Sequence, residues 1–595
     1  MYGTAAGNTL EKRAAQEDVE LAPSAALDEE RVGTQSFPLA KFLLATILLV
    51  GAIAVLSSSG TQQNAATLTK MDAVEIISSV PVSDSPGTDR KPREYVKYSA
   101  DLFAHPKVQA AFDDVKRIAY QHVYDTCFGP ENNMDAYINE KVMDNDLMFN
   151  DGMTVFNLDC RDAEANPLIA FIVILDKQGQ IVNVHNPPNR AESVNMYSTD
   201  TVLFSCISKG GQWLWNWKTD ATTKLPWTMD AHTLNYVAAT GNFYGLDRGD
   251  KFSPSTAVGY SSDGDRIWEY ENEGSHINFL SIDGDYAYLS LRSFSCLVKV
   301  DMRTNQVIET IGGLDSDFTI TDITGEVSTE GGWSHQHKFQ HLDDKYASLF
   351  DNHVNNEKSF IEDSNSHMRV LKIDSEAKTV SEVFAFDTGD KSRIYGGADV
   401  LPSGNVLGNS YPMVVEPAVE DRQYHVNVWE VTPAGELAAR FGFKGRNPAS
   451  PEDAASAFFH SVAPDEEPPI GWMVYNVERL YPAPTLARPC AFEYNGERFL
   501  QLLPFNTVRT QGKAPGTVYL VHGETQALLT KQPFAFHGSW LPQPVSVAVP
   551  AEVDDGVPLT LVLTNQWGDN RVVELGTFAG LDQCAALTAR RAFHI

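Results

Sequence analysis

The amino-acid sequence predicts a mainly β protein with a repeated β-hairpin unit, an N-terminal membrane-spanning segment and a β-rich C-terminal region. Three observations indicate this organisation. Short apolar runs alternate with small polar turns from residue 167 onwards, a long uncharged apolar run lies near the N-terminus, and the β runs after residue 485 lack the repeat. Strand-like runs bounded by turn residues are typical of β-sandwiches and of β repeat architectures.

The composition is that of a folded and strongly acidic protein. With 46 Lys and Arg against 78 Asp and Glu residues, the 595-residue chain has a formal net charge of −32, which disfavours nucleic acid as a partner. Hydrophobic residues make up 43%, so a mostly disordered chain is excluded. The six cysteines permit up to three disulfides, and no CxxC or CxxxH spacing indicates a zinc site.

Residues 37–59 are predicted to form a single transmembrane signal anchor. The run FLLATILLVGAIAVL follows Lys41, and spanning ~30 Å of hydrocarbon takes about 20 residues. A cleaved signal peptide is the alternative, but the long polar preface and the length of the run favour an anchor. Residues 1–36 are rich in Ala, Glu and Thr without periodicity, so they are predicted to be a disordered tail. Because positive charges precede the run, this tail is predicted to be cytoplasmic and the body lumenal or extracellular.

The segment between the anchor and the repeat is predicted to contain a linker and a helical region. Residues 60–92 are expected to form a stalk or linker. Apolar residues within 95–123 recur at helical spacing, so residues 93–165 are expected to form a mixed, partly helical segment.

Residues 166–484 are predicted to form a β-propeller. An apolar strand, a small polar turn and a second apolar strand occur at 168–184 and recur at 208–217, 260–270, 300–313, 373–386 and 431–443. These hairpins are spaced at ~47 residues, the size of a four-stranded propeller blade. Because the spacing is uneven and a hairpin is a common motif, an array of sandwiches is the alternative. Residues 485–595 are predicted to form a β-sandwich-like domain.

Histidines lie beside strand-like runs in three segments of this region. They are His232 in MDAHTLNYV, His276 in GSHINFLSIDGD, and His335, His337 and His341 in GGWSHQHKFQHLDD. The innermost strand of each propeller blade lines the central channel, so side chains from distant segments converge there. Imidazoles gathered with the Asn278 amide and the Arg292 guanidinium would suit a tetrahedral anion such as sulfate or phosphate. A neutral imidazole among such donors can also act as a nucleophile.

This histidine-bearing region resembles a known enzyme family. The stretches GSHIN, LSLRS, VDMRTNQVI, WSHQHKF and LFDN, with GGADVLPSGNVLGN further on, resemble the arylsulfotransferases, enzymes independent of the nucleotide PAPS. The resemblance covers roughly residues 165–485, about half of the chain. It implies a six-bladed β-propeller and neither a metal nor a nucleotide cofactor.

The same resemblance implies roles for individual residues. His337 in Q-H-x-F aligns with the nucleophile that carries the sulfuryl group as a sulfohistidine. His276, Asn278 and Arg292 align with residues that bind the sulfate oxygens and stabilise the transition state. His232 is similar in order to a histidine that donates to the sulfate or acts as acid and base. The implied reaction is ping-pong: an aryl sulfate sulfates His337, the phenol leaves, and a second phenol or an alcohol takes up the group.

Some of these assignments have alternatives. Strand alternation would turn His335 to the same side as His337, so either could be the nucleophile, and His335 could bind substrate instead. Trp333 could form an aromatic wall for the phenol or pack between blades. His341 and His353 are predicted to be surface residues. At the level of function, the alternative to a sulfotransferase is a membrane-anchored, non-catalytic propeller that binds an anionic or glycan ligand.

Overall fold

The computed structural model describes residues 96–584 apart from internal gaps. The gaps are residues 114–119, 130–133, 144–150, 162–166, 208–209, 248–254, 273, 355–364, 413–414, 417–418, 420–421 and 447–469. The predicted cytoplasmic tail at 1–36, anchor at 37–59 and linker at 60–92 therefore lie outside the described residues. Within the described part of the chain, no helix is long and apolar enough to cross a membrane.

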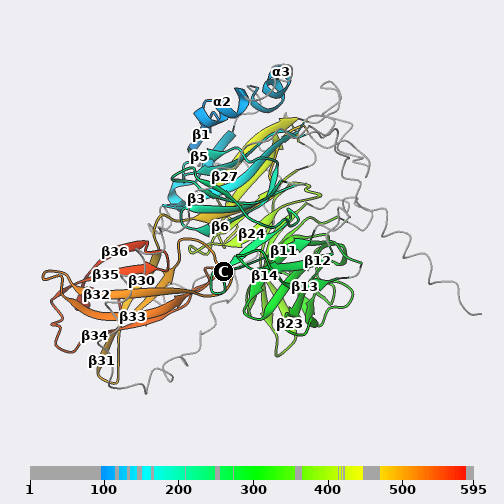
Figure 1. Ribbon diagram of the computed structural model, residues 1–595. Helices are drawn as coiled ribbons and strands as arrows, with labels where there is room; N and C mark the ends of the chain where they lie inside the picture. Colours follow the sequence, from blue (N-terminus) through cyan, green and yellow to red (C-terminus); the bar gives the residue numbers. More distant parts are fainter. Residues whose placement is uncertain are drawn as a thin grey trace, which may run out of the picture. The chain divides into compact units, whose positions relative to one another are not determined.

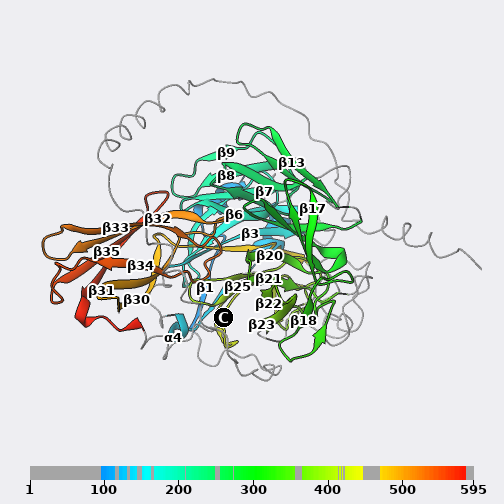
Figure 2. The ribbon, with the colours of Figure 1, turned by 90° about the horizontal axis from the view of Figure 1, so that it is seen from below.

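The described chain is mainly β, as predicted, and most of its strands pair antiparallel (Figures 1 and 2). Three four-stranded sheets follow one another, each with its strands in sequence order. The first contains β6 (Ala191–Ser198), β7 (Thr201–Cys206), β8 (Gly211–Asn216) and β9 (Thr222–Lys224). The second contains β10 (Leu234–Val237), β11 (Asn242–Asp247), β12 (Thr256–Tyr260) and β13 (Arg266–Glu271). The third contains β14 (Ile277–Asp283), β15 (Tyr286–Leu291), β16 (Cys296–Asp301) and β17 (Gln306–Ile311).

Two further strand groups continue this pattern. One contains β20 (His337–Asp343), β21 (Tyr346–Asp351), β22 (His367–Asp374) and β23 (Thr379–Asp387). Its outer edge is extended by β18 (Thr319–Thr321), which pairs parallel with β23, and by β19 (Val327–Ser328). The next group contains β24 (Gly397–Val400), β25 (Val406–Ser410), β26 (Tyr424–Val431) and β27 (Leu437–Arg446).

The last group joins strands from the two ends of this region. The early strands are β3 (Met153–Arg161), β4 (Pro167–Leu175) and β5 (Ile181–His185), and the late strands β28 (Ile470–Met473) and β29 (Val477–Leu480) both pair with β3. β4 reads PLIAFIVIL and is buried over most of its length, as expected of a strand covered on both faces. The boundary expected at residue 166 falls between β3 and β4, which pair in one sheet.

Side-chain amides connect these groups into a ring. Each bond runs from an Asn or Gln amide to a backbone carbonyl of the next group: Asn195 to Leu234, Asn235 to Leu280, Asn278 to Gln336, Gln340 to Ala398, Asn409 to Tyr475 and Asn476 to Val194. Because the last acceptor lies in β6, the bonds return to the first sheet. These bonds satisfy amides that are cut off from water. The resulting ring of antiparallel sheets is consistent with the predicted β-propeller.

The C-terminal strands form two sheets. One contains β30 (Thr485–Tyr494), β31 (Glu497–Phe505) and β34 (Val545–Val549), and the other contains β33 (Leu528–Phe536), β32 (Ala514–His522), β35 (Pro558–Asn565) and β36 (Asn570–Thr577). β34 alternates buried and exposed residues, which is the pattern of a strand with one face on the core. Both sheets contribute to one hydrophobic cluster, and a disulfide joins Cys490 to Cys584.

The segment before β3 contains helices and two strands. The helices are α2 (Pro106–Asp113), α3 (Tyr120–Val123), a π-helical turn at Tyr124–Phe128 and α4 (Glu140–Met143). Residues 96–100, expected within a helix, instead form β1 (Val96–Ala100), which pairs with β2 (Met134–Ile138). β2 in turn pairs with the outer strand β27, so this segment extends the ring of sheets. Sheet pairing with a distant strand overrides the local helical spacing.

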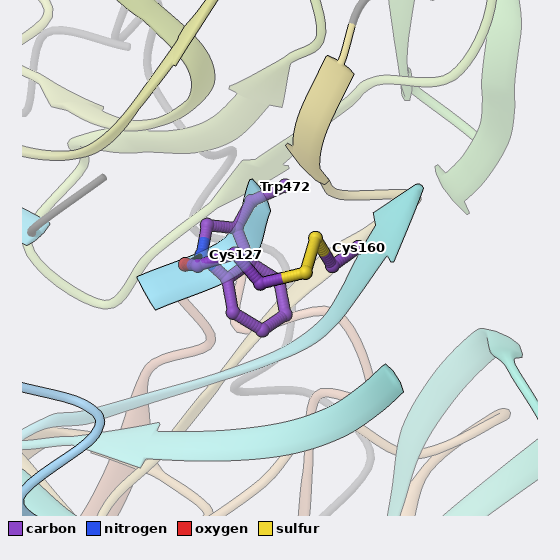
Figure 3. The surroundings of a disulfide bond; sticks show 3 residues. All are labelled: Cys127, Cys160 and Trp472. Atoms are coloured by element: carbon purple, nitrogen blue, oxygen red, sulfur yellow. Dashed lines mark hydrogen bonds between the residues drawn. A yellow bond between two sulfur atoms is a disulfide. The ribbon is translucent and has the colours of Figure 1, made fainter. Parts of the chain in front are cut away.

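A disulfide attaches the helical segment to β3. It joins Cys127, in the π-helical turn, to Cys160, and the indole of Trp472 lies beside it (Figure 3). Trp472 donates from its indole nitrogen to the carbonyl oxygen of Cys127 at 2.7 Å, so the late strand β28 also holds this junction. The other two cysteines, Cys206 and Cys296, are free and buried.

Candidate active site

His337 is the first residue of β20, and its imidazole is oriented by Asn352. The distance between His337 Nδ1 and Asn352 Oδ1 is 2.7 Å. The Asn352 amide nitrogen donates to the carbonyl oxygens of Ser392 and Tyr395, at 2.8 and 2.9 Å, so the oxygen of the amide must face the imidazole. His337 therefore carries its proton on Nδ1, and Nε2 keeps a free electron pair.

The imidazole of His337 is held in its neutral form. The residue is only 5% exposed. Burial, and after it the positive charge of Arg292, lowers the pKa of His337 well below its usual value. His276 and His232 lower this pKa further. At neutral pH, Nε2 is therefore unprotonated and nucleophilic.

His232 and His276 form a chain with a buried carboxylate. Asp230 bonds to His232 Nδ1 and also accepts from its backbone nitrogen at 2.9 Å. The Nε2 atoms of His232 and His276 are 3.3 Å apart. Burial by itself raises the pKa of Asp230, but His232 keeps this pKa below its usual value, so the carboxylate is ionised at neutral pH. The chain can store a proton on His232 and pass it to its neighbour.

Arg292 places a cation in the interior, and no carboxylate of the described residues neutralises it. It is 7% exposed, and its backbone nitrogen donates to the carbonyl oxygen of His276 at 2.9 Å. Its Nε has no hydrogen-bond partner, and among the described residues no carboxylate pairs with its guanidinium. Burying an unpaired cation costs free energy unless a ligand supplies the negative charge. The arrangement therefore suits an anion beside His337.

Asn278 lies in β14 and connects it to the residue before His337. Its amide nitrogen donates to the carbonyl oxygen of Gln336 at 2.8 Å, and its Oδ1 is buried without a partner. The structure thus gives Asn278 a position beside the backbone of His337, where it holds two sheets together.

His335 and Trp333 lie just before β20. β20 begins only at His337, and His335 has a φ of +50°, so strand alternation does not govern its direction. His335 Nδ1 lies 3.1 Å from the carbonyl oxygen of Val354. Trp333 packs in a hydrophobic cluster, and its indole nitrogen donates to the carbonyl oxygen of Ser295 at 2.9 Å.

Two tyrosines that the sequence did not single out border His337. The ring centroids of Tyr395 and Tyr475 lie 6.2 and 6.4 Å from that of the imidazole, and Tyr475 also lies 5.9 Å from His232. Burial, and after it the charge of Glu192, raises the pKa of Tyr475 well above its usual value, so its hydroxyl stays protonated. Asp230 was missed as well, although a carboxylate two residues before a histidine was a usable signal.

The prediction that His341 is a surface residue is wrong. His341 is 9% exposed, and its ring stacks on Tyr288 with centroids 3.7 Å apart. Burial lowers the pKa of His341 to about 3, so it is neutral. His353 is partly buried and pairs with Asp351 at 3.0 Å. Among the described residues, no cluster of histidine, cysteine and carboxylate side chains is arranged to hold a metal ion.

A family model described as "Arylsulfotransferase (ASST)" matches residues 250–417. The matched range runs from just before β12 to just after β25 and so covers part of the ring of sheets. The match confirms the resemblance that the motifs indicated, and its range includes His276, Arg292 and His337, whereas His232 lies before it. No curated protein matches the chain.

Several solved structures are similar to parts of the chain, all at low identity. A protein of unknown function from Bacteroides caccae is 12% identical and has a TM-score of 0.30, with 54% of this chain and 99% of that chain covered. TolB from Acinetobacter baumannii is 9% identical with a TM-score of 0.30, covering 54% and 66%. Hydrazine synthase from Kuenenia stuttgartiensis is 12% identical with a TM-score of 0.27, covering 60% and 95%.

Proposed function

We propose that this protein is a sulfotransferase that moves a sulfuryl group from an aryl sulfate to a phenol or an alcohol through a sulfohistidine at His337. In this proposal the ring of sheets is a six-bladed β-propeller, and its centre holds the reacting groups. The observation that carries the proposal has two parts. His337 is buried and neutral with a free electron pair on Nε2, and the guanidinium of Arg292, whose charge lowers the pKa of His337, has no ion pair among the described residues. The match of the arylsulfotransferase family model to residues 250–417 supports the same reaction class.

In the first half-reaction, Nε2 of His337 attacks the sulfur of the aryl sulfate. The bond between sulfur and the aryl oxygen breaks, its electron pair leaves with the oxygen, and the phenoxide takes a proton from the histidine pair His232–His276. Arg292 donates to the sulfuryl oxygens, whose negative charge is brought into a water-poor site. His337 keeps the proton on Nδ1, where Asn352 stabilises the positive imidazole ring of the sulfohistidine.

In the second half-reaction, the acceptor hydroxyl attacks the same sulfur. The hydroxyl proton goes to the His232–His276 pair, and Asp230 stabilises the positive charge formed there. The electron pair of the nitrogen–sulfur bond returns to Nε2 of His337, which restores the starting state. Asn278 positions the backbone before His337, and its second amide hydrogen would donate to a sulfuryl oxygen.

Two variants separate this proposal from binding without chemistry. With 4-nitrophenyl sulfate as donor and a phenol as acceptor, His337→Ala should abolish transfer, and His335→Ala, the neighbouring control, should retain it. The wild type incubated with donor alone should acquire an acid-labile sulfuryl group on His337, detected by mass spectrometry. Full transfer by His337→Ala would refute the assignment of His337 as the nucleophile. Loss of transfer only in His335→Ala would assign the nucleophile to His335 instead.

A non-catalytic anion-binding module is the second candidate, because the unpaired guanidinium of Arg292 favours anion binding in either case. The two candidate functions differ in whether an aryl sulfate leaves a sulfuryl group on His337. If inorganic sulfate protects the protein against thermal unfolding but no sulfohistidine forms with any aryl sulfate, the binding module is correct.

We also propose that the chain is a single-pass membrane protein with its body in the lumen or outside the cell. The Lys41-flanked apolar run supports the anchor, and the disulfides Cys127–Cys160 and Cys490–Cys584 support an oxidising compartment. Protease digestion of intact membrane vesicles tests this, since the body should be protected until detergent is added.

A further inference from the structure

A cavity lies at the far ends of β10, β14 and β20, the strands that begin at or just after His232, His276 and His337. It has a volume of about 290 Å³ and is bordered by the last residues of β6, β10, β14 and β20. Its remaining wall comes from two connections of the C-terminal sheets, residues 509–513 and 537–539, and from Trp567. His337 begins β20, and Gln340 to Asp343 border the cavity, so three to six steps of ~3.3 Å separate the cavity lining from the proposed nucleophile by about 10–20 Å.

We propose that this cavity binds a neutral polyhydroxylated ligand of about the size of a monosaccharide. The charge of the lining is close to balanced. Asp283, Asp343 and Asp344 face Lys345 and Lys513, while Arg509 and Glu478, which also border the cavity, pair with each other. The cavity therefore has no excess of cations to hold an anion such as an aryl sulfate, and only a small excess of carboxylates.

Aromatic rings form one wall of the cavity. Tyr197 of β6 and Tyr236 of β10 both border it, with ring centroids 4.3 Å apart and planes tilted by 34°. Trp567 borders it as well. All three side chains are partly exposed, so flat apolar surface faces the cavity. The C–H faces of a sugar ring pack on such surface, whereas its hydroxyls need donors and acceptors elsewhere.

Polar groups with free bonding capacity also border the cavity. They are Asp283, Asp344 and Lys513, whose side chains make no hydrogen bond or ion pair within the described ranges. Carboxylates accept two hydroxyl hydrogens and an ammonium group donates three, so together they match the mixed donors and acceptors of a polyol. The cavity volume is at the low end of ligand sites, which suits one sugar unit.

The wall from the C-terminal sheets is held in place before any ligand binds. Gln511 accepts from the backbone nitrogen of Ile282 at 2.8 Å and donates to Asn235 at 3.1 Å. Arg509 donates to Gln340 at 2.8 Å and pairs with Asp399 at 2.9 Å. These bonds tie the connection to four strands of the ring, β10, β14, β20 and β24, so binding costs little free energy for ordering this wall.

The test is a binding titration on the full-length protein. Glucose, galactose, mannose and N-acetylglucosamine are the neutral probes, with choline as the cationic probe and inorganic phosphate as the anionic one. At least one sugar should bind saturably in the millimolar range by calorimetry. Tyr236→Ala and Asp283→Ala should each weaken that binding at least tenfold. Asp285→Ala is the matched control, because Asp285 lies in the same turn, is mostly exposed and does not border the cavity.

The result must also be independent of the histidine site. His337→Ala should bind the sugar as the wild type does, which excludes binding as an acceptor alcohol beside His337. Far-ultraviolet circular dichroism should show native secondary structure in each variant, and Asp283→Asn replaces Asp283→Ala if the latter fails to fold. Absence of saturable binding by every sugar, preferential binding of choline or phosphate, or unchanged affinity in both cavity variants would each overturn the proposal.

Discussion

Replacing Lys338 with methionine is expected to destabilise the ring of sheets. Lys338 follows His337 in β20 and is 3% exposed. Its ammonium group lies 2.7 Å from Asp399 and 3.0 Å from Glu478, and Arg509 pairs with the same two carboxylates. Burial by itself raises the pKa of Asp399, but Arg509 and Lys338 hold this pKa below its usual value. The group is therefore a buried network of two cations and two anions.

The magnitude follows from the charge that the substitution leaves behind. Methionine has nearly the length and volume of lysine without its charge, so Lys338→Met opens little space but leaves the network with one uncompensated negative charge. Removing one partner of a buried ion pair costs about 3–5 kcal/mol. The region from Met153 to Leu480 has roughly 330 residues, and at about 2.1 cal/mol/K per residue this loss lowers the melting temperature by about 4–7 °C.

The assay is thermal unfolding followed by circular dichroism at neutral pH. Lys345→Met, at an exposed position of the same β20–β21 turn, is the matched control and should unfold within about 1 °C of the wild type. The double variant Lys338→Met/Asp399→Asn removes one charge of each sign and should recover part of the loss. The reasoning would be refuted if Lys338→Met left the melting temperature unchanged or lowered it no more than Lys345→Met does.

Three further predictions concern stability. Because burial lowers the pKa of His341 to about 3, only the unfolded state binds its proton between about pH 3 and pH 6.5, so stability falls as the pH drops through this range. His341→Asn should reduce this slope by about 1.4 kcal/mol per pH unit in urea titrations. Removing the Cys127–Cys160 disulfide, which closes a separation of 33 residues, by the double variant Cys127→Ser/Cys160→Ser should cost ~3–4 kcal/mol in urea titrations without reductant, so that the Cys490–Cys584 disulfide stays intact in both proteins. Gly396→Ala, at a φ of +112° with an aromatic ring 2.3 Å from the added Cβ, should cost about 2–4 kcal/mol, whereas Gly556→Ala, in open space, should cost little by the same measurement.

Local sequence patterns were enough to predict the mainly β class and the positions of several candidate residues. Alternation and turn chemistry act over a few residues, so hairpins such as β14–β15 are visible in the sequence. The strands within residues 93–165 were harder to predict, because β3 pairs with β29 more than 300 residues later and β2 pairs with β27. Such long-range partners leave no periodic signal near either strand.

The partners of the site residues were also hidden. Asn352 gives His337 its tautomer, and its place directly after a strand-like run allowed either a strand end or this orienting role, between which only the folded structure decides. Tyr475 lies beside both His337 and His232, yet a tyrosine in a β repeat usually indicates packing. The burial of His341 depends on Tyr288 of the neighbouring sheet, which the polar surroundings of His341 in the sequence do not indicate.

By itself, the amino-acid sequence determined that the chain is mainly β, that it is acidic, and that His276, Arg292 and His337 stand in arylsulfotransferase-like motifs, because each of these is a property of composition or of short spacing. Tertiary structure alone decided which nitrogen of His337 is free, that Arg292 meets no carboxylate in the described part of the chain, and that a cavity forms where four strands meet the C-terminal sheets. Protonation, charge balance and enclosed space depend on groups that are distant in sequence and meet only when the ring closes.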